Sequence, residues 1–392
     1  MIGPSVDDRA AMVALAHLAG VGPATMLECH RTVGGATCWQ GLVAGAVAAL
    51  PPLLAATMAK DARSGGHLLA DARRMDPAAL HDRHVDAGLA VLLHGDEGYP
   101  RRLLEDPAPP PVLFLVGDPG ALARPTVAIV GTRNATRLGR ETAGALAGEL
   151  SVRGISVVSG LALGIDGAAH LALVDPGVPR SAAAGRPVAV VANGLDVAYP
   201  RRHRHLQRLI VEHGLLVSET PLGGAPLRWR FPARNRIIAG LADAVVVVES
   251  RSSGGSMSTA AEALARDVPL LAVPGHPTSP AAAGTLDLIA DGAVPVRDVD
   301  DVLVAIGLGG LRPPGADRRP DGLAPRPAGP GGTAGRVLAA LDGPRSFGEL
   351  LDTVDRPASD VSVALASLEA EGLIARQGLW YERRGSGRDA VS

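Results

Sequence analysis

Glycines, small polar residues and arginines gather just after the apolar runs in the middle of this sequence. Glycine lets a ligand approach the backbone closely, and the planar guanidinium group of arginine binds phosphate oxygens in pairs. Backbone amides combined with arginines are typical of phosphate-binding sites. We therefore predict one continuous crevice that binds phosphate groups. Its predicted members are Gly131, Thr132, Arg133, Ser159, Gly160, Asn193, Gly194, Tyr199, Arg202, Arg234, Asn235, Arg236 and Ser256.

The motif FPARNRIIAG concentrates two of these arginines directly before a strand-like apolar run. Our hypothesis is that Arg234 and Arg236 lie opposite phosphates, with Asn235 fixing a turn between them. An alternative is that the arginines cap helix ends or form ion pairs with Glu219 and Glu249. Spacing alone leaves both interpretations open.

The elements that must position this crevice alternate between strand and helix. Strands are predicted at 126–131, 155–160, 187–194, 214–219, 243–250 and 268–275, and helices at 137–153, 164–174, 201–213 and 257–266. Most strand candidates are apolar without a period of two, which is typical of strands buried on both faces. The alternation predicts an α/β fold with a doubly wound, mostly parallel sheet. In such sheets ligands bind beyond the carboxyl ends of the strands, where the helix starts at 136, 164 and 257 would point amides into the crevice.

Motifs for catalysis or cofactor binding are weak. The sequence contains neither GxxxxGK[ST] nor, after the first strand, GxGxxG. Asp166 and His170 are four residues apart on one helix face and are suited to acid–base chemistry, although such pairs more often cap and pack a helix. Cys29 and Cys38 are the only cysteines, so we expect neither a disulfide framework nor a zinc site. No cofactor and no metal are predicted.

Composition divides the 392 residues into parts. Hydrophobic residues make up 47% and the net charge is −2, so most of the chain should fold, without a uniformly basic surface. The predicted parts are a helical domain at 1–80 with a helix-hairpin-helix or SAM-like turn, a Rossmann-like domain at 95–305, a disordered linker at 309–333 and a winged-helix domain at 334–383. Residues 32–59 carry no charge but include Pro51 and Pro52, which favour two short helices over a membrane span. The start lacks the features of a signal peptide, and we expect a cytoplasmic protein.

Several motifs occur together in an order that resembles a known family. They are VAIVGTR, SGLALGIDGAAH, NGLDVAYP, LLVSETPLG, FPARNRIIAGLADAVVVVES and VPG. In this order they resemble the DNA-processing protein A family, also called DprA or Smf, over residues 95–305. The sequence departs from the family pattern at His203, where Asn is usual, and at Leu286, where an amide side chain is usual.

The resemblance implies a non-catalytic protein of natural transformation and DNA recombination. Members bind single-stranded DNA, protect incoming DNA and load the RecA recombinase, and they have an extended Rossmann fold that tends to form homodimers. By the motif match, Arg133, the loop 199–202, Arg234 and Arg236 would face the DNA. A base would stack on Tyr199 or Trp229, a mode of binding that is largely independent of base sequence.

Two other functions remain open at this stage. The stretch GGSMSTAAE has paired glycines and a glutamate, Glu262, and is similar to the GGxGTxxE stretch of phosphoribohydrolases, although it is one residue longer. A nucleotide-processing enzyme of this kind would release a base from nucleoside monophosphates. A purely structural dimer scaffold would have no affinity for DNA.

Overall fold

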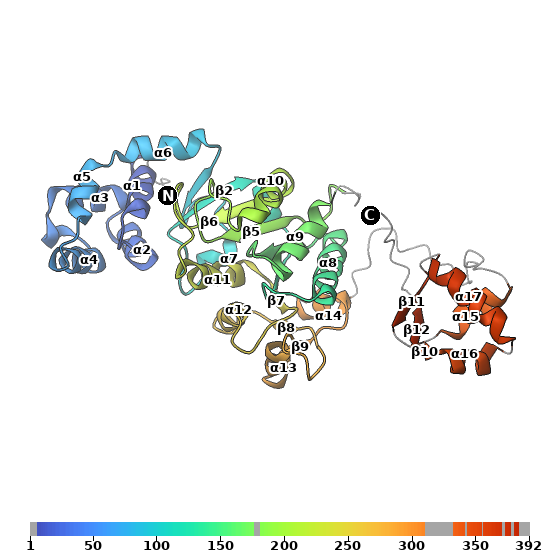
Figure 1. Ribbon diagram of the computed structural model, residues 1–392. Coiled ribbons are helices and arrows are strands. Elements are labelled where there is room, and N and C mark those ends of the chain that lie inside the picture. The colour runs from blue at the N-terminus through green and yellow to red at the C-terminus, as the bar shows by residue number, and fades with distance from the viewer. Residues whose placement is uncertain are drawn as a thin grey trace. The chain divides into compact units, whose positions relative to one another are not determined.

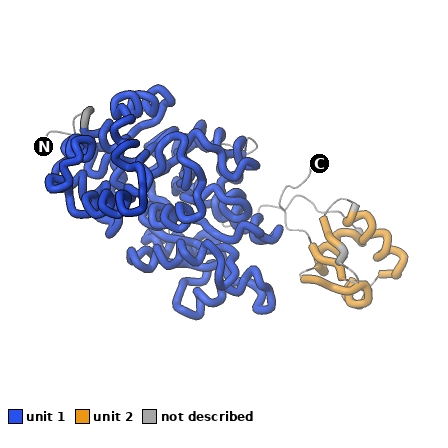
Figure 2. Tube along the Cα trace, turned by 60° about the vertical axis from the view of Figure 1, so that its left-hand side comes forward, with its two compact units in different colours: residues 1–314 blue, residues 315–392 orange. Residues whose placement is uncertain are grey.

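The computed structural model describes residues 6–175, 181–309, 332–341, 343–354, 356–370, 373–377 and 380–383. The chain forms two compact units, residues 1–314 and residues 315–392 (Figure 2). Most of the predicted linker, residues 310–331, lies outside the described residues. The finer division of the first unit into domains at 1–80 and 95–305 stays a prediction.

The first unit contains a large sheet with the strand order β1-β2-β6-β5-β4-β3-β7-β8-β9 (Figure 1). Strands β6, β5, β4, β3, β7, β8 and β9 run parallel, whereas β2 pairs antiparallel with both β1 and β6. The bounds are β1 (Ala90–Leu93), β2 (Val112–Gly117), β3 (Thr126–Val130), β4 (Ser156–Ser159), β5 (Pro187–Val191), β6 (Leu215–Ser218), β7 (Ala244–Val247), β8 (Leu270–Ala272) and β9 (Val294–Pro295). The predicted mostly parallel sheet is therefore confirmed, and the six predicted strands correspond to β3 to β8.

Helices cover both faces of this sheet. Ala128 and Val130 of β3 pack in a core with helices α11 and α12, whereas Val127 and Ile129 pack in another with α8, α9 and α14. The bounds are α7 (Arg101–Leu104), η2 (Pro119–Ala123), α8 (Arg137–Val152), α9 (Ile165–Val174), η3 (Arg201–His203), α10 (Arg204–His213), α11 (Arg230–Leu241), α12 (Gly255–Leu264), α13 (Ala283–Ala290) and α14 (Val299–Ala305). Because β3 lies between β4 and β7, the helices that follow β3 and β7 leave to opposite faces, and this topology opens a crevice at their carboxyl ends.

The turn predicted inside FPARNRIIAG is wrong. The motif lies within the helix α11, and Asn235 occupies a buried position in that helix. The physical reason is the apolar spacing after it, because Ile237, Ile238 and Leu241 form one helical face that packs against the sheet. The sequence interpretation also missed β1, β2 and the short β9, although the apolar run at β2 is visible in the sequence.

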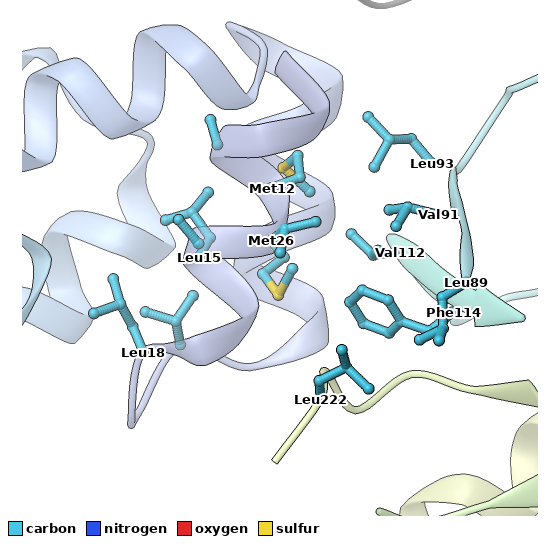
Figure 3. Packing of buried hydrophobic residues seen from close by; sticks show 14 of the residues in the cluster. Met12, Leu15, Leu18, Met26, Leu89, Val91, Leu93, Val112, Phe114 and Leu222 are labelled. Atoms are coloured by element: carbon cyan, nitrogen blue, oxygen red, sulfur yellow. The ribbon is translucent and has the colours of Figure 1, made fainter. Parts of the chain in front are cut away.

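A helical block precedes the sheet and packs against its β1–β2 end. Its bounds are α1 (Val6–His17), α2 (Pro23–Thr32), α3 (Gly35–Ala44), η1 (Val47–Ala49), α4 (Pro52–Arg63), α5 (Leu68–Arg74) and α6 (Pro77–Asp86). Met12 and Met26 of the block share one core with Phe114 and Leu222 of the sheet region (Figure 3). The uncharged stretch forms separate short helices, α3 and α4, and among the described residues no helix has the length and apolarity to span a membrane.

The second unit contains helices and a small antiparallel sheet of order β10-β12-β11. Its elements are α15 (Gly332–Ala340), β10 (Arg345–Ser346), α16 (Phe347–Val354), α17 (Ala358–Ala370), β11 (Ile374–Gln377) and β12 (Trp380–Arg383). Leu338, Leu350, Leu365 and Leu368 belong to its separate hydrophobic core. The assignment of this unit as a winged helix stays a prediction.

Candidate functional site

A cleft of about 880 Å³ lies beyond the carboxyl ends of β3 and β7, at the switch point of the sheet. Three segments form most of its wall, namely the loop after β3, the first half of α11 and the loop that leads into α12. The lining residues predicted from the sequence are Gly131, Thr132, Arg133, Tyr199, Arg234, Asn235 and Ser256. The structure thus brings together side chains from parts of the chain that lie more than a hundred residues apart.

The open side of the cleft carries positive charge. Arg133, Arg228 and Arg251 line it, and we call these three exposed residues the cleft rim. None of the three forms an ion pair with another residue that the structure describes. The guanidinium carbon of Arg133 lies 5.4 Å from the centre of the Phe231 ring, which holds the charge over an aromatic face without neutralising it. The rim therefore keeps three guanidinium groups available to an anionic ligand.

The buried side of the cleft has a different character. Arg234 and Asp166 line it, Gly160 lies directly beside them, and we call these three residues the cleft floor. Arg234 is only 8% exposed, and its Nη1 donates to the carbonyl oxygens of Gly160 (3.0 Å) and Val190. Asp166 Oδ2 accepts a hydrogen bond from the Gly160 amide at 3.1 Å. A Cβ atom at Gly160 would lie 2.6 Å from the Arg234 guanidinium and 2.7 Å from the Asp166 carboxylate, so these groups approach one another closely because position 160 is glycine.

The charges of the floor oppose each other. Burial raises the pKa of Asp166, while the nearby Arg234 and backbone amides lower it. Burial lowers the pKa of Arg234 to about 10, and Asp166 opposes that shift. Arg234 is therefore protonated near neutral pH, and its charge interacts with groups inside the protein.

Of the three helix starts predicted to face the crevice, only that of α12 is open. The carboxylate of Glu249 already occupies the start of α8, where it accepts from the Thr136 amide at 2.9 Å. Asp166 lies in the first turn of α9. By contrast, α12 begins after Gly254 with no side-chain cap and no acidic residue in its first turn. Its positive end and its orphan amides are free to attract an anion.

Aromatic side chains accompany the arginines. The chain contains only three each of Phe, Trp and Tyr. Tyr199 and Phe231 both line the cleft, with their ring centres 5.4 Å apart. Trp229 is 61% exposed and directly follows the cleft residue Arg228. Exposed aromatic faces beside guanidinium groups suit a ligand that carries both flat bases and phosphates.

The remaining predicted residues lie around the cleft or outside it. Asn193 and Gly160 line a small adjoining cavity of about 70 Å³, together with Arg133, Tyr199 and Arg234. Ser159 is fully buried and donates to the Ile129 carbonyl at 2.6 Å, and the Gly194 amide donates to Gly224 at 2.9 Å. Arg202 is exposed on η3 and lines neither cavity.

Arg236 does not point into the cleft. Its Nη2 donates to both carboxylate oxygens of Glu219, at 2.5 and 2.6 Å, and its Nη1 donates to the Ala108 carbonyl. The alternative interpretation, an internal ion pair, is therefore the one that describes Arg236, because the carboxylate of Glu219 is partly buried and gains from a charged partner. Glu249, the other candidate partner, bonds to Thr136 instead.

The residues suggested for catalysis are engaged elsewhere. Glu262 pairs with Arg266 at 2.5 Å and is not among the residues that line the cleft. Asp166 accepts from backbone amides of the floor, and His170 is fully buried with a pKa that desolvation lowers to about 3. Among the described residues these two do not present an exposed acid–base couple.

The cleft residues that sequence reasoning did not predict include two rim arginines, Arg228 and Arg251, and the aromatic Phe231. Arg251 follows the end of β7 by a few residues, so the rule that located Arg133 also points to it. Phe231 is the first residue of FPARNRIIAG. An aromatic residue beside arginines indicates a nucleic-acid contact, but the interpretation of this motif used only the arginines. Arg228 lies in an irregular loop before α11 and had no signal in the sequence.

Comparison with known proteins agrees with this architecture. Residues 90–307, more than half of the chain, match the family described as DNA recombination-mediator protein A. The chain belongs to this family. It is 31% identical to the protein Smf of Synechocystis over 357 residues, covering 81% of this chain and 86% of that protein. It is 37% identical to the DNA processing protein DprA of Bacillus subtilis over 218 residues, covering 55% of this chain and 71% of that protein.

A solved structure of the same family is also similar. The crystal structure of DNA processing protein A from Streptococcus pneumoniae aligns with a TM-score of 0.62 at 29% identity. The alignment covers 76% of this chain and 98% of that chain. The resemblance inferred from the motifs is thereby confirmed, and the mostly parallel sheet with its flanking helices is the fold of a DNA recombination-mediator protein.

Proposed function

We propose that this recombination-mediator protein binds single-stranded DNA in the cleft beyond the carboxyl ends of β3 and β7. The observation that carries the proposal is the cleft rim, where three exposed guanidinium groups without an ion pair to a described residue line the same cleft as the uncapped start of α12. Guanidinium groups and helix-start amides bind phosphate oxygens, and neither depends on the identity of a base. The family's name as a DNA recombination mediator agrees with this ligand.

The aromatic residues favour single strands over duplexes. A base can stack on Tyr199, Phe231 or Trp229 only when its own face is free, and in a duplex both faces are covered by neighbouring bases. Stacking contributes about 1–3 kcal/mol per base and tolerates every base. The predicted binding is therefore tight for unpaired strands and indifferent to sequence.

Fluorescence anisotropy with labelled oligo-dT and with a duplex of the same length tests the proposal. We expect clear binding of oligo-dT, weaker binding of the duplex, and affinities that fall as salt rises because bound phosphates release counterions. Equal or tighter binding of the duplex would contradict the assignment. Incubation with nucleoside monophosphates provides the enzymatic comparison, and release of free base that is lost in Glu262→Ala would overturn the non-catalytic function.

The wider role follows from the family resemblance. We propose that the protein is a cytoplasmic homodimer that protects incoming DNA in natural transformation and loads RecA recombinase on it. The measurement is the rate at which RecA filaments form on single-stranded DNA with and without this protein. Faster filament formation in the presence of the protein supports the role of a mediator. An unchanged rate would contradict that role, and the DNA-binding proposal would still stand.

A further inference from the structure

Glu249 lies next to the cleft and is not among the residues that line it. It stands two residues after the end of β7, and its carboxylate reaches the neighbouring segment after β3. Oε2 accepts from the Thr136 amide at 2.9 Å, and Oε1 accepts from the Thr136 hydroxyl at 2.6 Å. The same hydroxyl oxygen accepts from the Gly139 amide at 3.0 Å, so Thr136 caps α8 while Glu249 holds the cap.

The backbone of Glu249 contacts the other end of the same loop. Its carbonyl oxygen accepts from the Thr132 amide at 2.7 Å. Glu249, just after β7, thus contacts the loop 132–136 at both ends, and Arg133 lies on that loop. Glu249 makes three hydrogen bonds to this loop, and two of them use its carboxylate, so we expect the loop to lose its position when the carboxylate is removed.

The first turn of α8 is shaped to admit the carboxylate. A Cβ atom at Gly139 would lie 2.3 Å from the Glu249 carboxyl carbon, so a side chain at this position would displace it. The carboxylate also takes the place that a phosphate would take at the positive end of α8. An internal carboxylate beside a cleft that binds anions repels them, so its presence needs a role that outweighs this repulsion.

We propose that Glu249 is a positioning residue that holds the loop 132–136 so that the Arg133 guanidinium stands at the cleft. This inference rests on the proposed function, since it takes Arg133 as a phosphate contact. In this proposal Glu249 itself does not contact the DNA. Its hydrogen bonds to Thr136 place the loop, and the loop places the arginine.

The direction in which Glu249→Ala changes the affinity for DNA distinguishes a positioning role from a purely electrostatic effect of the carboxylate. By charge alone, Glu249→Ala removes a repulsive carboxylate and should tighten binding to a polyanion. By positioning, the same substitution should weaken binding, because the loop and Arg133 lose their anchor. Glu249→Gln removes the charge but keeps an oxygen acceptor for the Thr136 amide, and therefore should bind at least as tightly as the parent.

The experiment measures oligo-dT affinity by anisotropy for the full chain and its variants. We expect Glu249→Ala to weaken binding by about threefold to tenfold, which is the usual effect of losing one ordinary hydrogen bond. Thr136→Val removes the hydroxyl contact to Glu249 but keeps the amide contact and the carboxylate, so it should weaken binding in the same direction even if Glu249→Ala fails to fold. Glu141→Ala, which removes an exposed carboxylate from the same helix, serves as the control and should bind like the parent.

A double-mutant cycle with Arg133→Ala identifies the route of the effect. If Glu249 acts through Arg133, the double variant Arg133→Ala/Glu249→Ala should bind no more weakly than Arg133→Ala alone. Additive losses, or a Glu249→Ala variant that binds more tightly than the parent, would overturn the role of Glu249. Parent-like binding by Arg133→Ala is a different result, because it would remove the proposed site itself.

Discussion

The rim and the floor of the cleft both use arginine, and they use it in opposite ways. Arg133 on the rim is exposed and lies over the Phe231 ring, with no ion pair to a described residue. Arg234 on the floor is buried, donates to two carbonyl oxygens and faces Asp166. The comparison teaches that a guanidinium group is available to a ligand only when the fold has not already satisfied it.

The difference follows from solvation. A buried charge is costly unless it is paired and hydrogen-bonded, so the floor must satisfy Arg234 internally before any ligand arrives. An exposed guanidinium keeps its hydration and can exchange water for phosphate oxygens. We therefore expect substitutions in the floor to change stability first, and substitutions on the rim to change affinity first.

The largest effect is expected for Arg234→Met. It would leave the Asp166 carboxylate buried without its positive partner, and breaking a buried pair in this way costs about 3–5 kcal/mol of unfolding free energy. Urea denaturation of the parent and the variant measures it. The matched rim variant Arg133→Met should lose less than about 0.5 kcal/mol. Equal stabilities for the two variants would erase the distinction between floor and rim.

The next effect concerns pH and His170. Burial lowers the pKa of this fully buried histidine to about 3, below its ordinary value of 6.5, so the unfolded chain binds one more proton between these values. Its stabilising contribution is complete above pH 6.5. As the pH falls through the window, the unfolding free energy should decline by about 1.4 kcal/mol per pH unit from this group alone.

Urea midpoints of the parent and of His170→Gln, measured at several pH values, isolate this contribution. Every other histidine is common to both proteins, so the difference between the two profiles reports His170. We expect the variant to have the shallower decline below pH 6.5. Parallel profiles would mean that His170 is accessible to protons in the folded state.

Among the aromatic residues of the cleft, Tyr199→Leu should weaken oligo-dT binding by about 1–3 kcal/mol, the contribution of one stacked base. The salt dependence should stay unchanged because no phosphate contact is lost. Anisotropy at several salt concentrations measures both quantities. Trp380→Leu provides the control, since this tryptophan is similarly exposed but belongs to the second unit. A loss of equal size in the control would argue that stacking at the cleft is not specific.

The smallest effect is expected for Arg202→Ala. This arginine is exposed and lines neither cavity, so its removal should change the oligo-dT affinity by less than about twofold, within the range of ordinary surface substitutions. The same anisotropy titration measures it. A loss as large as that of Arg133→Ala would mean that the DNA-binding surface includes η3.

Much of this arrangement was predictable because the sheet follows simple rules. Strands buried on both faces are continuous apolar runs, and ligands collect at their carboxyl ends, so Gly131, Arg133 and Ser256 were correctly brought together. The family motifs added the position of FPARNRIIAG in the same crevice. Strand patterns and family motifs together thus predicted six strands of the sheet and several residues of the cleft wall.

The sequence did not indicate which charges are already satisfied. Arg234 and Arg236 stand two residues apart in one motif, yet one lies in the cleft floor and the other pairs with Glu219. A helix, rather than the expected turn, separates them by about 200° around its axis. Their partners come from distant segments, and only the folded chain shows them. The same reason kept the Glu249–Thr136 contact hidden.

The most direct test of the account is the salt dependence of oligo-dT binding for the parent and Arg133→Ala. If the rim arginines bind phosphates, the variant should bind oligo-dT about tenfold more weakly than the parent at moderate salt. Its plot of log affinity against log salt should be shallower by about 0.7, the value for one lost contact to a single strand. A variant with the parent's slope and affinity would show that the strand does not pass along Arg133, and would contradict the central claim.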